Sequence, residues 1–430
     1  MLHSPRYVGN VGERGRLARN KKAVAVIVLA TLAWFLAATY AVIVAIWGCA
    51  YLILCRLDQQ RIRLTPVAEW RPDRPAPSLA VIIACHNEEQ GIAACVRQLQ
   101  AQNYPNLQIV VANDRSTDGT GEILRDLASR DGRIRVVENA ELPPGWVGKS
   151  HAVHCAVRAC QADYLLFLDS DVELAPHALV SAMDKVCRDG VDFLTLWPRL
   201  DLRSFSERLL TPPALVALGA WAMPHFSTGG ASGVAIGNGQ FMLVRRQAYE
   251  AIGGHTGVGN ELAEDAVLAA KARDAGQCCW SGMGDGLYSA YRVGDFSRTA
   301  NSLARVFIGT LCTPWRILAS TQILTAGTFT AAWVLPAAAI CLALGFYPAL
   351  FSVFLVLNGL HWIVATATLR RMFAMTLVRP AGLIWYPIGS AICAGILFWC
   401  LYLLVTGGRL RWGTTEYRVH GSRVAPVTTD

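Results

Sequence analysis

The sequence predicts an α/β protein with a doubly wound, mainly parallel sheet and flanking transmembrane helices. Between about residues 56 and 300, short apolar runs alternate with helical patterns, which is typical of a parallel sheet covered on both faces. Long uncharged segments lie on either side of that region. Of the 430 residues, 53% are hydrophobic and only 16% are charged, below the roughly 25% usual in soluble domains.

The charge and cysteine content exclude some classes of protein. The net charge of +8 is expected from basic residues beside membrane segments. No basic run interleaved with aromatic residues occurs, so we expect no nucleic-acid partner. The 13 cysteines are scattered and include no Cys-x-x-Cys pair. This pattern favours a reducing compartment over a disulfide scaffold.

The first apolar segment, residues 23–55, follows a basic N-terminal tail at residues 1–22. It is too long for a signal-peptide core, so we interpret it as one long or tilted transmembrane anchor. Three more transmembrane helices are expected within residues 321–406. The first two are separated at Gly345–Pro348, the third begins near Leu383, and residues 407–430 form a C-terminal tail.

The charges between these spans predict an integral protein of the cell (inner) membrane with a cytoplasmic catalytic domain. The uncharged turn at Gly345–Pro348 is expected outside, and the loop with Arg370, Arg371 and Arg379 inside. Four spans then place both basic termini outside, which conflicts with the positive-inside rule. A re-entrant segment or exceptional termini would resolve this conflict.

The strands of the central domain, residues 56–296, are expected at four apolar runs: Leu79–Cys85, Leu107–Ala112, Ile134–Val137 and Tyr164–Leu168. Helical patterns lie between and after them, at Glu89–Gln102, Thr117–Ser129, Lys149–Gln161 and Ala263–Ala275. Two further helical patterns, Ser204–Phe226 and Arg298–Ser320, mix apolar residues with Trp and Arg. They lie in the membrane interface or pack against the domain, and we assign residues 297–320 to an interfacial amphipathic helix.

Polar clusters follow three of these strands: His86-Asn87-Glu88, Asn113-Asp114 and Asp169-Ser170-Asp171. Parallel sheets bind ligands at the carboxyl ends of their strands, so the clusters are expected to converge. Asp169 and Asp171 can hold Mg²⁺ or Mn²⁺ through oxygen ligands. A cation bound to a diphosphate neutralises charge on a leaving group. The strand context favours this role over a simple loop or helix cap.

Two other segments carry candidate site residues. Glu264 and Asp265 open a helix, where they either stabilise its dipole or supply a general base. In Gly145–Lys149, the lysine can reach phosphate oxygens at a helix N-terminus. The spacing is not that of a P-loop, and Gly229–Gly239 lacks the dinucleotide fingerprint, so a triphosphatase or nicotinamide site is not expected.

Together these motifs resemble the A-type fold of glycosyltransferase family 2, over about Leu79 to Tyr291. Ala84–Glu89 resembles the opening Asn-Glu segment, with Ala84 in place of a frequent proline, and Asn113–Thr120 resembles the DDxSxDxT segment. Asp169 and Asp171 match the DxD, and Glu264-Asp265 matches the ED motif. Gly145–Lys149, Gly237–Arg246 and Gly253-Gly254-His255 are similar to a membrane-bound branch that includes hopene-associated, carotenoid and ceramide glycosyltransferases.

The resemblance implies a nucleotide-sugar donor, with a UDP-sugar expected. The residues implied for donor binding are Cys85, Asn87, Glu88, Asp114, Lys149 and Asp169. Asp171, with Asp169 beside it, is implied to hold Mg²⁺ or Mn²⁺. Asp265 is implied as the base that deprotonates the acceptor, with Glu264 next to it in the catalytic pair. The acceptor side is implied at Gly237, Asn238, Gly239 and Gln240.

Two features of the sequence bear on the acceptor and the mode of transfer. The family's processive synthases carry a Q/RxxRW motif, of which Ser302–Val306 keeps only Arg305. Single inverting transfer is therefore favoured over polymer synthesis. An active site tied to membrane spans favours a lipid hydroxyl as acceptor. A processive synthase, a soluble-substrate enzyme and a non-catalytic membrane scaffold remain alternatives, although all four aspartates of the motifs are retained, which disfavours the scaffold.

Overall fold

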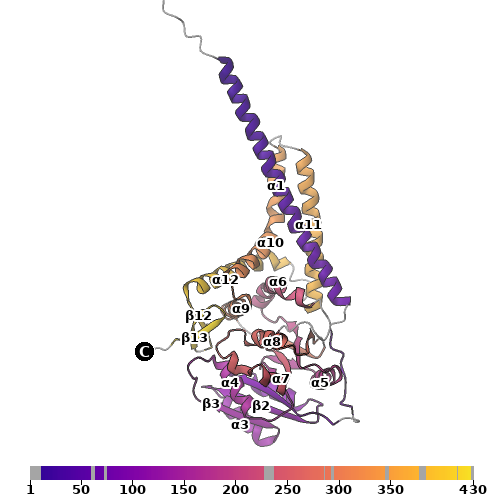
Figure 1. Cartoon of the computed structure of the whole chain (residues 1–430), viewed down its shortest axis with the longest axis vertical. Coiled ribbons are helices and arrows are strands. Elements are labelled where there is room, and N and C mark those ends of the chain that lie inside the picture. The colour runs from indigo at the N-terminus through magenta and orange to yellow at the C-terminus, as the bar shows by residue number, and fades with distance from the viewer. Residues whose placement is uncertain are drawn as a thin grey trace, which may run out of the picture. The chain divides into compact units, whose positions relative to one another are not determined.

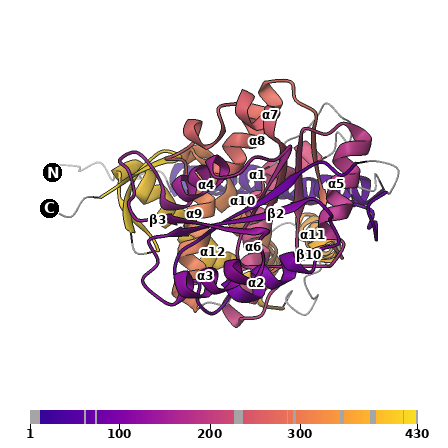
Figure 2. The same cartoon turned by 90° about the horizontal axis from the view of Figure 1, so that it is seen from below.

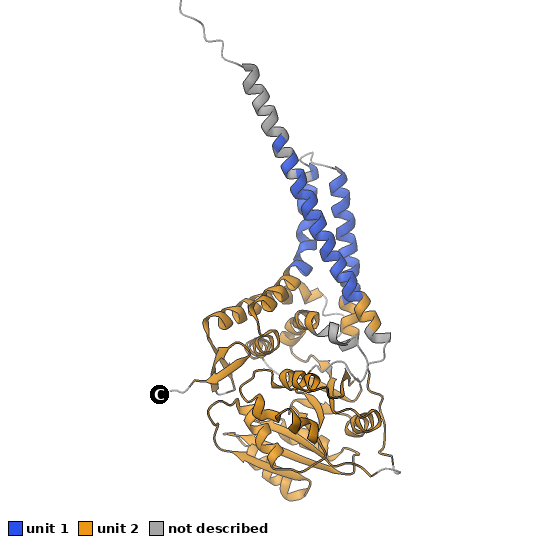
Figure 3. Cartoon of the chain, in the orientation of Figure 1, with its two compact units in different colours: residues 1–51, 326–368 blue, residues 52–325, 369–430 orange. Residues whose placement is uncertain are grey.

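The computed structural model describes residues 11–59, 63–71, 75–226, 237–284, 286–291, 295–343, 348–376, 384–413 and 415–427. The chain divides into two compact units (Figure 3). Unit 1 comprises residues 1–51 and 326–368, and unit 2 comprises residues 52–325 and 369–430.

Unit 1 is built from parts of three long helices, α1 (Val11–Gln59), α10 (Pro314–Ala343) and α11 (Pro348–Thr376) (Figure 1). Its polar side chains face inward: the Asn358 amide donates to the Tyr40 hydroxyl at 3.4 Å, and both residues are buried. Large apolar side chains are exposed instead, among them Phe35, Trp333, Val356 and Ile363. An apolar exterior around a hydrogen-bonded polar interior suits helices surrounded by lipid.

Among the described residues, four helices are long and apolar enough to cross a membrane, at Ala30–Arg56, Pro314–Ile340, Ala349–Ala374 and Tyr386–Thr406. Helix α1 begins at Val11, so from there onward the expected basic tail is helical. Lysine and arginine have high helix propensity, and charge alone does not end a helix. The turn residues 345–347 and Arg379 lie outside the described residues.

Unit 2 contains a seven-stranded sheet in the order β3-β2-β1-β4-β8-β6-β9. The strands are β1 (Leu79–Cys85), β2 (Leu107–Asp114), β3 (Ile134–Asn139), β4 (Tyr164–Leu168), β6 (Phe193–Trp197), β8 (Phe241–Arg245) and β9 (Cys279–Met283). Strand β8 is antiparallel to both of its neighbours, and the other pairings are parallel. The predicted mainly parallel α/β class is confirmed.

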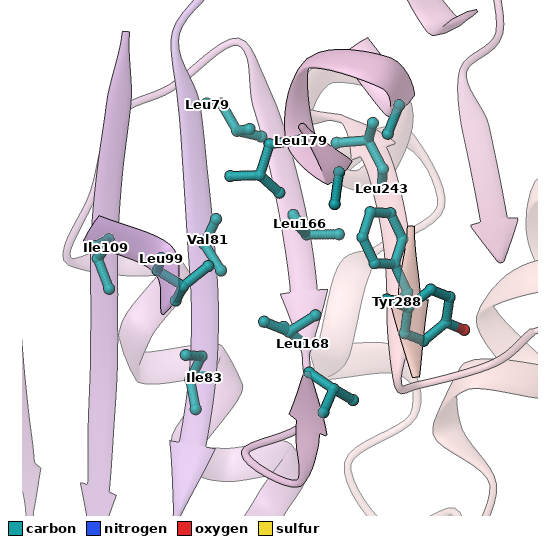
Figure 4. Close-up of a cluster of buried hydrophobic side chains, with 14 of the residues drawn as sticks. Leu79, Val81, Ile83, Leu99, Ile109, Leu166, Leu168, Leu179, Leu243 and Tyr288 are labelled. Atoms are coloured by element: carbon teal, nitrogen blue, oxygen red, sulfur yellow. The ribbon is translucent and has the colours of Figure 1, made fainter. Parts of the chain in front are cut away.

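Helices cover both faces of this sheet, as Figure 2 shows. On one face lie α2 (Ile92–Gln100), α3 (Thr120–Arg130) and α5 (Ala178–Asp189); on the other lie α4 (Gly148–Arg158), α7 (Arg246–Ala251) and α8 (Glu264–Asp274). Successive side chains of β1 enter opposite clusters, with Val81 in the first (Figure 4) and Ile82 in the second. Because both faces are covered, β1 is apolar throughout.

A third layer of unit 2 is formed by α6 (Phe205–Phe226), α9 (Phe296–Leu311) and α12 (Tyr386–Thr406), which pack against one another. Leu210, Phe307 and Leu397 lie in their shared core. The helix expected over residues 297–320 is broken, because Cys312 adopts a left-handed conformation with φ 57° and Pro314 begins α10. A proline disfavours helical backbone at the residue before it.

The domain also contains a small sheet of β5 (Val172–Leu174), β7 (Arg199–Asp201) and β10 (Tyr288–Tyr291), and a 3₁₀ helix at Gly254–Gly257. The C-terminal residues are not a tail as expected. They form an antiparallel sheet of β11 (Arg409–Trp412), β12 (Thr415–His420) and β13 (Arg423–Pro426). Charged residues alternate there with Leu410, Tyr417, Val419 and Val424, which are buried. Glycines with positive φ, Gly413 and Gly421, stand at the turns.

The contact between α6 and α12 depends on Gly389. A Cβ atom at this position would lie 2.0 Å from the carbonyl oxygen of Leu209. We expect Gly389→Ala to destabilise unit 2 by about 1–3 kcal/mol or more, because neither backbone can move without unpacking the layer. The measurement is thermal unfolding of the detergent-purified protein. Gly395→Ala in the same helix is the matched control, since a Cβ there meets nothing within 4 Å; equal melting temperatures for the two variants would contradict this contact.

Candidate active site

The ends of β1 and β2 lie side by side, because Cys85 is paired with Asn113 in the parallel register. The loops that follow are joined through Asn87, whose side-chain oxygen accepts the Thr117 N–H at 2.8 Å. The Glu88 N–H donates to the Thr120 hydroxyl at 2.8 Å. Asn87 therefore holds two predicted site segments together. The thiol of Cys85 is buried in the core and contacts the carbonyl of Ala112.

Asp114 at the end of β2 is buried and bound by the next residue in the chain. Arg115 donates Nε–H and Nη2–H to its two carboxylate oxygens at 2.9 and 2.8 Å. Arg115 has φ 52°, a conformation that costs energy outside glycine. Gly148 packs against this pair, since a Cβ there would lie 2.6 Å from an oxygen of Asp114 and a nitrogen of Arg115. Sequence reasoning missed Arg115, although it lies inside the segment that carries Asp114.

Lys149 lies in the first turn of α4 and joins the two acidic motifs. Its Nζ atom is 2.9 Å from Asp169 Oδ1 and 3.2 Å from Glu264 Oε1. Burial alone would lower the pKa of Lys149, but the charges of Asp169 and Glu264 outweigh it and raise that pKa. Burial raises the pKa of Glu264, and the positive charge of Lys149 opposes that shift. The ammonium group of Lys149, which the sequence predicted to bind phosphate, is thus held by two carboxylates in this structure.

Asp265 lies beside Glu264 at the start of α8 and contacts the predicted acceptor-side segment. Its carboxylate accepts the Gly239 N–H at 2.6 Å and the Ala266 N–H at 2.8 Å. Gly237 passes so close that a Cβ would lie 2.0 Å from the Asp265 carbonyl oxygen. The structure therefore brings the predicted base and acceptor-side segment together, and glycine is required at position 237.

Asn238, in the same Gly237–Gln240 segment, is held by hydrogen bonds to residues of β6 and β10. The Asn238 amide donates to the carbonyl of Leu196 at 2.7 Å and to the Tyr288 hydroxyl at 3.2 Å. Tyr288 also donates to the carbonyl of Leu196. The Gln240 N–H reaches the Asn238 side chain at 3.4 Å. Tyr288 was not predicted from the sequence, because a four-residue strand with the sequence Tyr-Ser-Ala-Tyr gives no signal for this contact. Residues 229–236 lie outside the described residues.

Glu88 lies within a concentration of negative charge. Its pKa is raised by burial and then by the charge of Asp171, with smaller contributions from Asp118 and Asp169, while Arg298 lowers it. Among the described residues, no three Asp, Glu, His or Cys side chains converge as a complete metal-binding group. A cation held by one or two carboxylates together with substrate phosphates needs no such group. The assignment of Asp171 and Asp169 as ligands of Mg²⁺ or Mn²⁺ therefore stays a prediction from the sequence.

His255 lies in the buried core and interacts electrostatically with Lys149 of the site. It is buried, its Nδ1 atom lies 2.8 Å from the Tyr249 hydroxyl, and its ring lies 5.1 Å from that of Phe167. Burial lowers its pKa to about 3, helped by the charge of Lys149. The imidazole is therefore neutral at physiological pH. It packs as part of the core, where the positive charge of Lys149 acts on it.

This sheet, with carboxylates at the ends of its parallel strands and a second acidic pair at a facing helix, has the arrangement expected of a glycosyltransferase domain of the GT-A class. Residues 80–253 match the family described as Glycosyl transferase family 2. The chain thus carries a glycosyltransferase family 2 domain, as the sequence motifs predicted.

Known proteins support this assignment. A β-monoglucosyldiacylglycerol synthase of Nostoc sp. is 29% identical over 182 residues, which cover 41% of this chain and 38% of the relative. A 4,4′-diaponeurosporenoate glycosyltransferase of Staphylococcus haemolyticus is 30% identical over 27% of this chain and 31% of its own length. In each case the similarity spans less than half of the relative.

A solved structure shares the fold. The mannosyltransferase PcManGT from Pyrobaculum calidifontis, in complex with GDP-Man and Mn²⁺, superposes with a TM-score of 0.50 and 20% sequence identity. The superposition covers 79% of this chain and 99% of that protein. The similarity extends beyond the matched family segment and supports the GT-A fold.

Proposed function

We propose that the protein transfers one sugar from a nucleotide-sugar, with a UDP-sugar expected, to the hydroxyl group of a membrane lipid, with inversion of the anomeric configuration. The observation that carries the proposal is the convergence of Lys149, Asp169, Glu264 and Asp265 beside Gly239. Two relatives whose names describe the glycosylation of lipids support the acceptor class.

Asp265 is proposed as the general base. Its carboxylate is fixed by two backbone N–H groups and borders the Gly237–Gln240 segment, where an acceptor hydroxyl would approach. Removal of the hydroxyl proton by a positioned carboxylate makes the oxygen a better nucleophile for attack at the anomeric carbon. A single displacement of this kind inverts that carbon.

The donor is proposed to bind along the strand ends. Asn87, Glu88, Asp114 and Asp169 would contact it, with Asp114 held in place by Arg115. Lys149 carries a positive charge at a helix N-terminus, a position that suits a diphosphate, and it would exchange part of its contact with Asp169 for a phosphate oxygen. Asp171 and Asp169 would hold Mg²⁺ or Mn²⁺, which would neutralise the charge that develops on the nucleoside diphosphate.

The direct test is nucleotide release by the detergent-purified protein with Mn²⁺ or Mg²⁺. UDP-sugars and GDP-mannose are supplied in turn, with and without a total lipid extract. Lipid-stimulated release from one donor is the expected result, and the glycosylated lipid identifies the acceptor. Release stimulated only by a water-soluble acceptor would overturn the lipid proposal. Long glycan products would instead favour a processive synthase, and nucleotide binding without release would favour the scaffold.

We further propose that α12 lies along the membrane surface. The sheet after it packs on the catalytic domain, with the Val424 N–H donating to the Asn260 carbonyl at 2.9 Å. Two successive spans, α10 and α11, return the chain to the side it left, so a membrane-crossing α12 would carry this sheet away from the domain. The outer face of α12 exposes Ile388, Phe398, Tyr402 and Val405, which suits contact with lipid.

This topology predicts that the C-terminus shares the side of the catalytic domain, whereas the N-terminus lies across the membrane. In sealed vesicles with the domain facing outward, added protease should remove a C-terminal epitope and spare an N-terminal one. Protection of the C-terminal epitope would show that α12 crosses. The expected result removes the conflict between the C-terminal arginines and the positive-inside rule.

A further inference from the structure

The C-terminal sheet, β11 to β13, lies outside the segment matched by the family yet contacts the backbone that leads to the proposed base. The Leu262 N–H donates to the Ser422 carbonyl at 3.1 Å. Arg423 Nε lies 2.9 Å from Glu261 Oε1, and Glu261 is buried. Residues 260–262 lie just before Glu264 and Asp265. The sheet therefore fixes the backbone that leads into α8.

The same sheet reaches the proposed diphosphate site through Tyr417 of β12. This side chain is 2% exposed, and its hydroxyl accepts the Gly148 N–H at 3.4 Å. The first N–H groups of a helix have no partner within it, and Gly148 is the first residue of α4. Burial raises the pKa of Tyr417, so its hydroxyl remains protonated at neutral pH.

The neighbours of Gly148 are themselves proposed donor-binding residues. Gly148 packs against the Asp114–Arg115 pair, and Lys149 follows it directly. Val147, just before it, shares a buried cluster with Leu262 and Tyr417. Tyr417 therefore packs at the point where the end of β2, the start of α4 and the segment leading to α8 meet.

The turn between β11 and β12 also contacts the loop after β1, which carries the proposed donor-binding residues Asn87 and Glu88. Gly413, with φ +59°, lies beside His86: a Cβ there would be in ordinary van der Waals contact with the imidazole, 3.5 Å from Cδ2. The preceding residue, Trp412, lies beneath the Arg305 guanidinium of α9, 4.7 Å from the ring centre. The sheet thus connects α9 to the loop that carries Asn87 and Glu88.

We propose that the C-terminal sheet forms part of the donor site. In this proposal Tyr417 is a positioning residue, which fixes the N-terminus of α4 where the nucleotide diphosphate would bind. This inference rests on the proposed function. It implies that the donor site is complete only when the C-terminal strands are docked, so residues far outside the family segment control donor affinity.

The test compares Tyr417→Phe with Tyr104→Phe in the full-length protein. Each variant removes one hydroxyl and keeps the ring; Tyr104 is equally buried, but its hydroxyl donates to the Pro77 carbonyl, away from the proposed site. UDP and GDP binding are measured by calorimetry with Mn²⁺, beside the melting temperature and the kinetic constants. We expect Tyr417→Phe to weaken nucleotide binding about three- to tenfold, to raise KM for the donor and to leave kcat nearly unchanged. Tyr104→Phe should leave nucleotide binding unchanged.

Each other outcome has a definite meaning. Wild-type affinity in Tyr417→Phe would overturn the positioning role while leaving the proposed function intact. An equal loss of affinity in both variants would overturn it as well, because the effect would then follow general stability. If the wild-type protein bound neither nucleotide, the proposed function would fail first, and this inference with it.

Discussion

Asp265→Asn is expected to lower the turnover number by about 10²–10⁴-fold while nucleotide binding stays close to wild type. An amide has the shape of the carboxylate, and its oxygen can still accept the Gly239 N–H that Asp265 accepts at 2.6 Å. It cannot take the proton of an acceptor hydroxyl, and the loss of a general base typically costs this much. The measurements are nucleotide release at saturating donor and lipid, and nucleotide affinity by calorimetry.

The matched control is Asp274→Asn, at the other end of the same helix. That carboxylate is 68% exposed and pairs with Arg273, so its loss should leave turnover unchanged. If Asp265→Asn retained full turnover, Asp265 would not be the base. If it lost turnover and nucleotide binding together, the residue would act in donor binding instead.

The second large effect is expected for Asp171→Asn, which should weaken Mn²⁺-dependent nucleotide binding by about a hundredfold. The charge of Asp171 is the main electrostatic contribution that raises the pKa of Glu88, so the side chain adds to local negative potential that a divalent cation would relieve. The measurement is UDP and GDP affinity with Mn²⁺ and with EDTA.

Asp126→Asn serves as the control, because that carboxylate lies on the surface of α3, 54% exposed and paired with Arg130. It should not change either affinity. Nucleotide binding by the wild-type protein that EDTA leaves unaffected would argue against a metal at this site. Unchanged binding in Asp171→Asn alone would assign the metal to other residues.

Local patterns predicted the sheet well. Strands β1 and β4 have the predicted bounds, because a continuous apolar run flanked by polar residues determines a buried strand with little help from elsewhere. Helix ends were less accurate. Helix α2 begins at Ile92 rather than Glu89 because the loop residues before it bond to the neighbouring loop, as the Glu89 N–H does to Asp118 at 3.2 Å. That partner is distant in sequence.

The C-terminal strands show where local patterns were insufficient. Their signal is short and weak, because three strands of four to six residues carry few apolar positions. Such a sheet is stable only when it packs against something larger. Here the larger partner is the catalytic domain with α9 and α12, and no local pattern could reveal it.

The class of the protein follows from local patterns: the apolar periods predict the sheet and the apolar helices, and the order of acidic motifs predicts the family. Which side chains meet depends on how the layers pack. That packing pairs Lys149 with Asp169 and Glu264, seats Asp265 against Gly237 and Gly239, and brings Tyr417 to Gly148. Periodicity arises from short-range backbone geometry, whereas these contacts join residues up to 269 positions apart and exist only once the layers have packed.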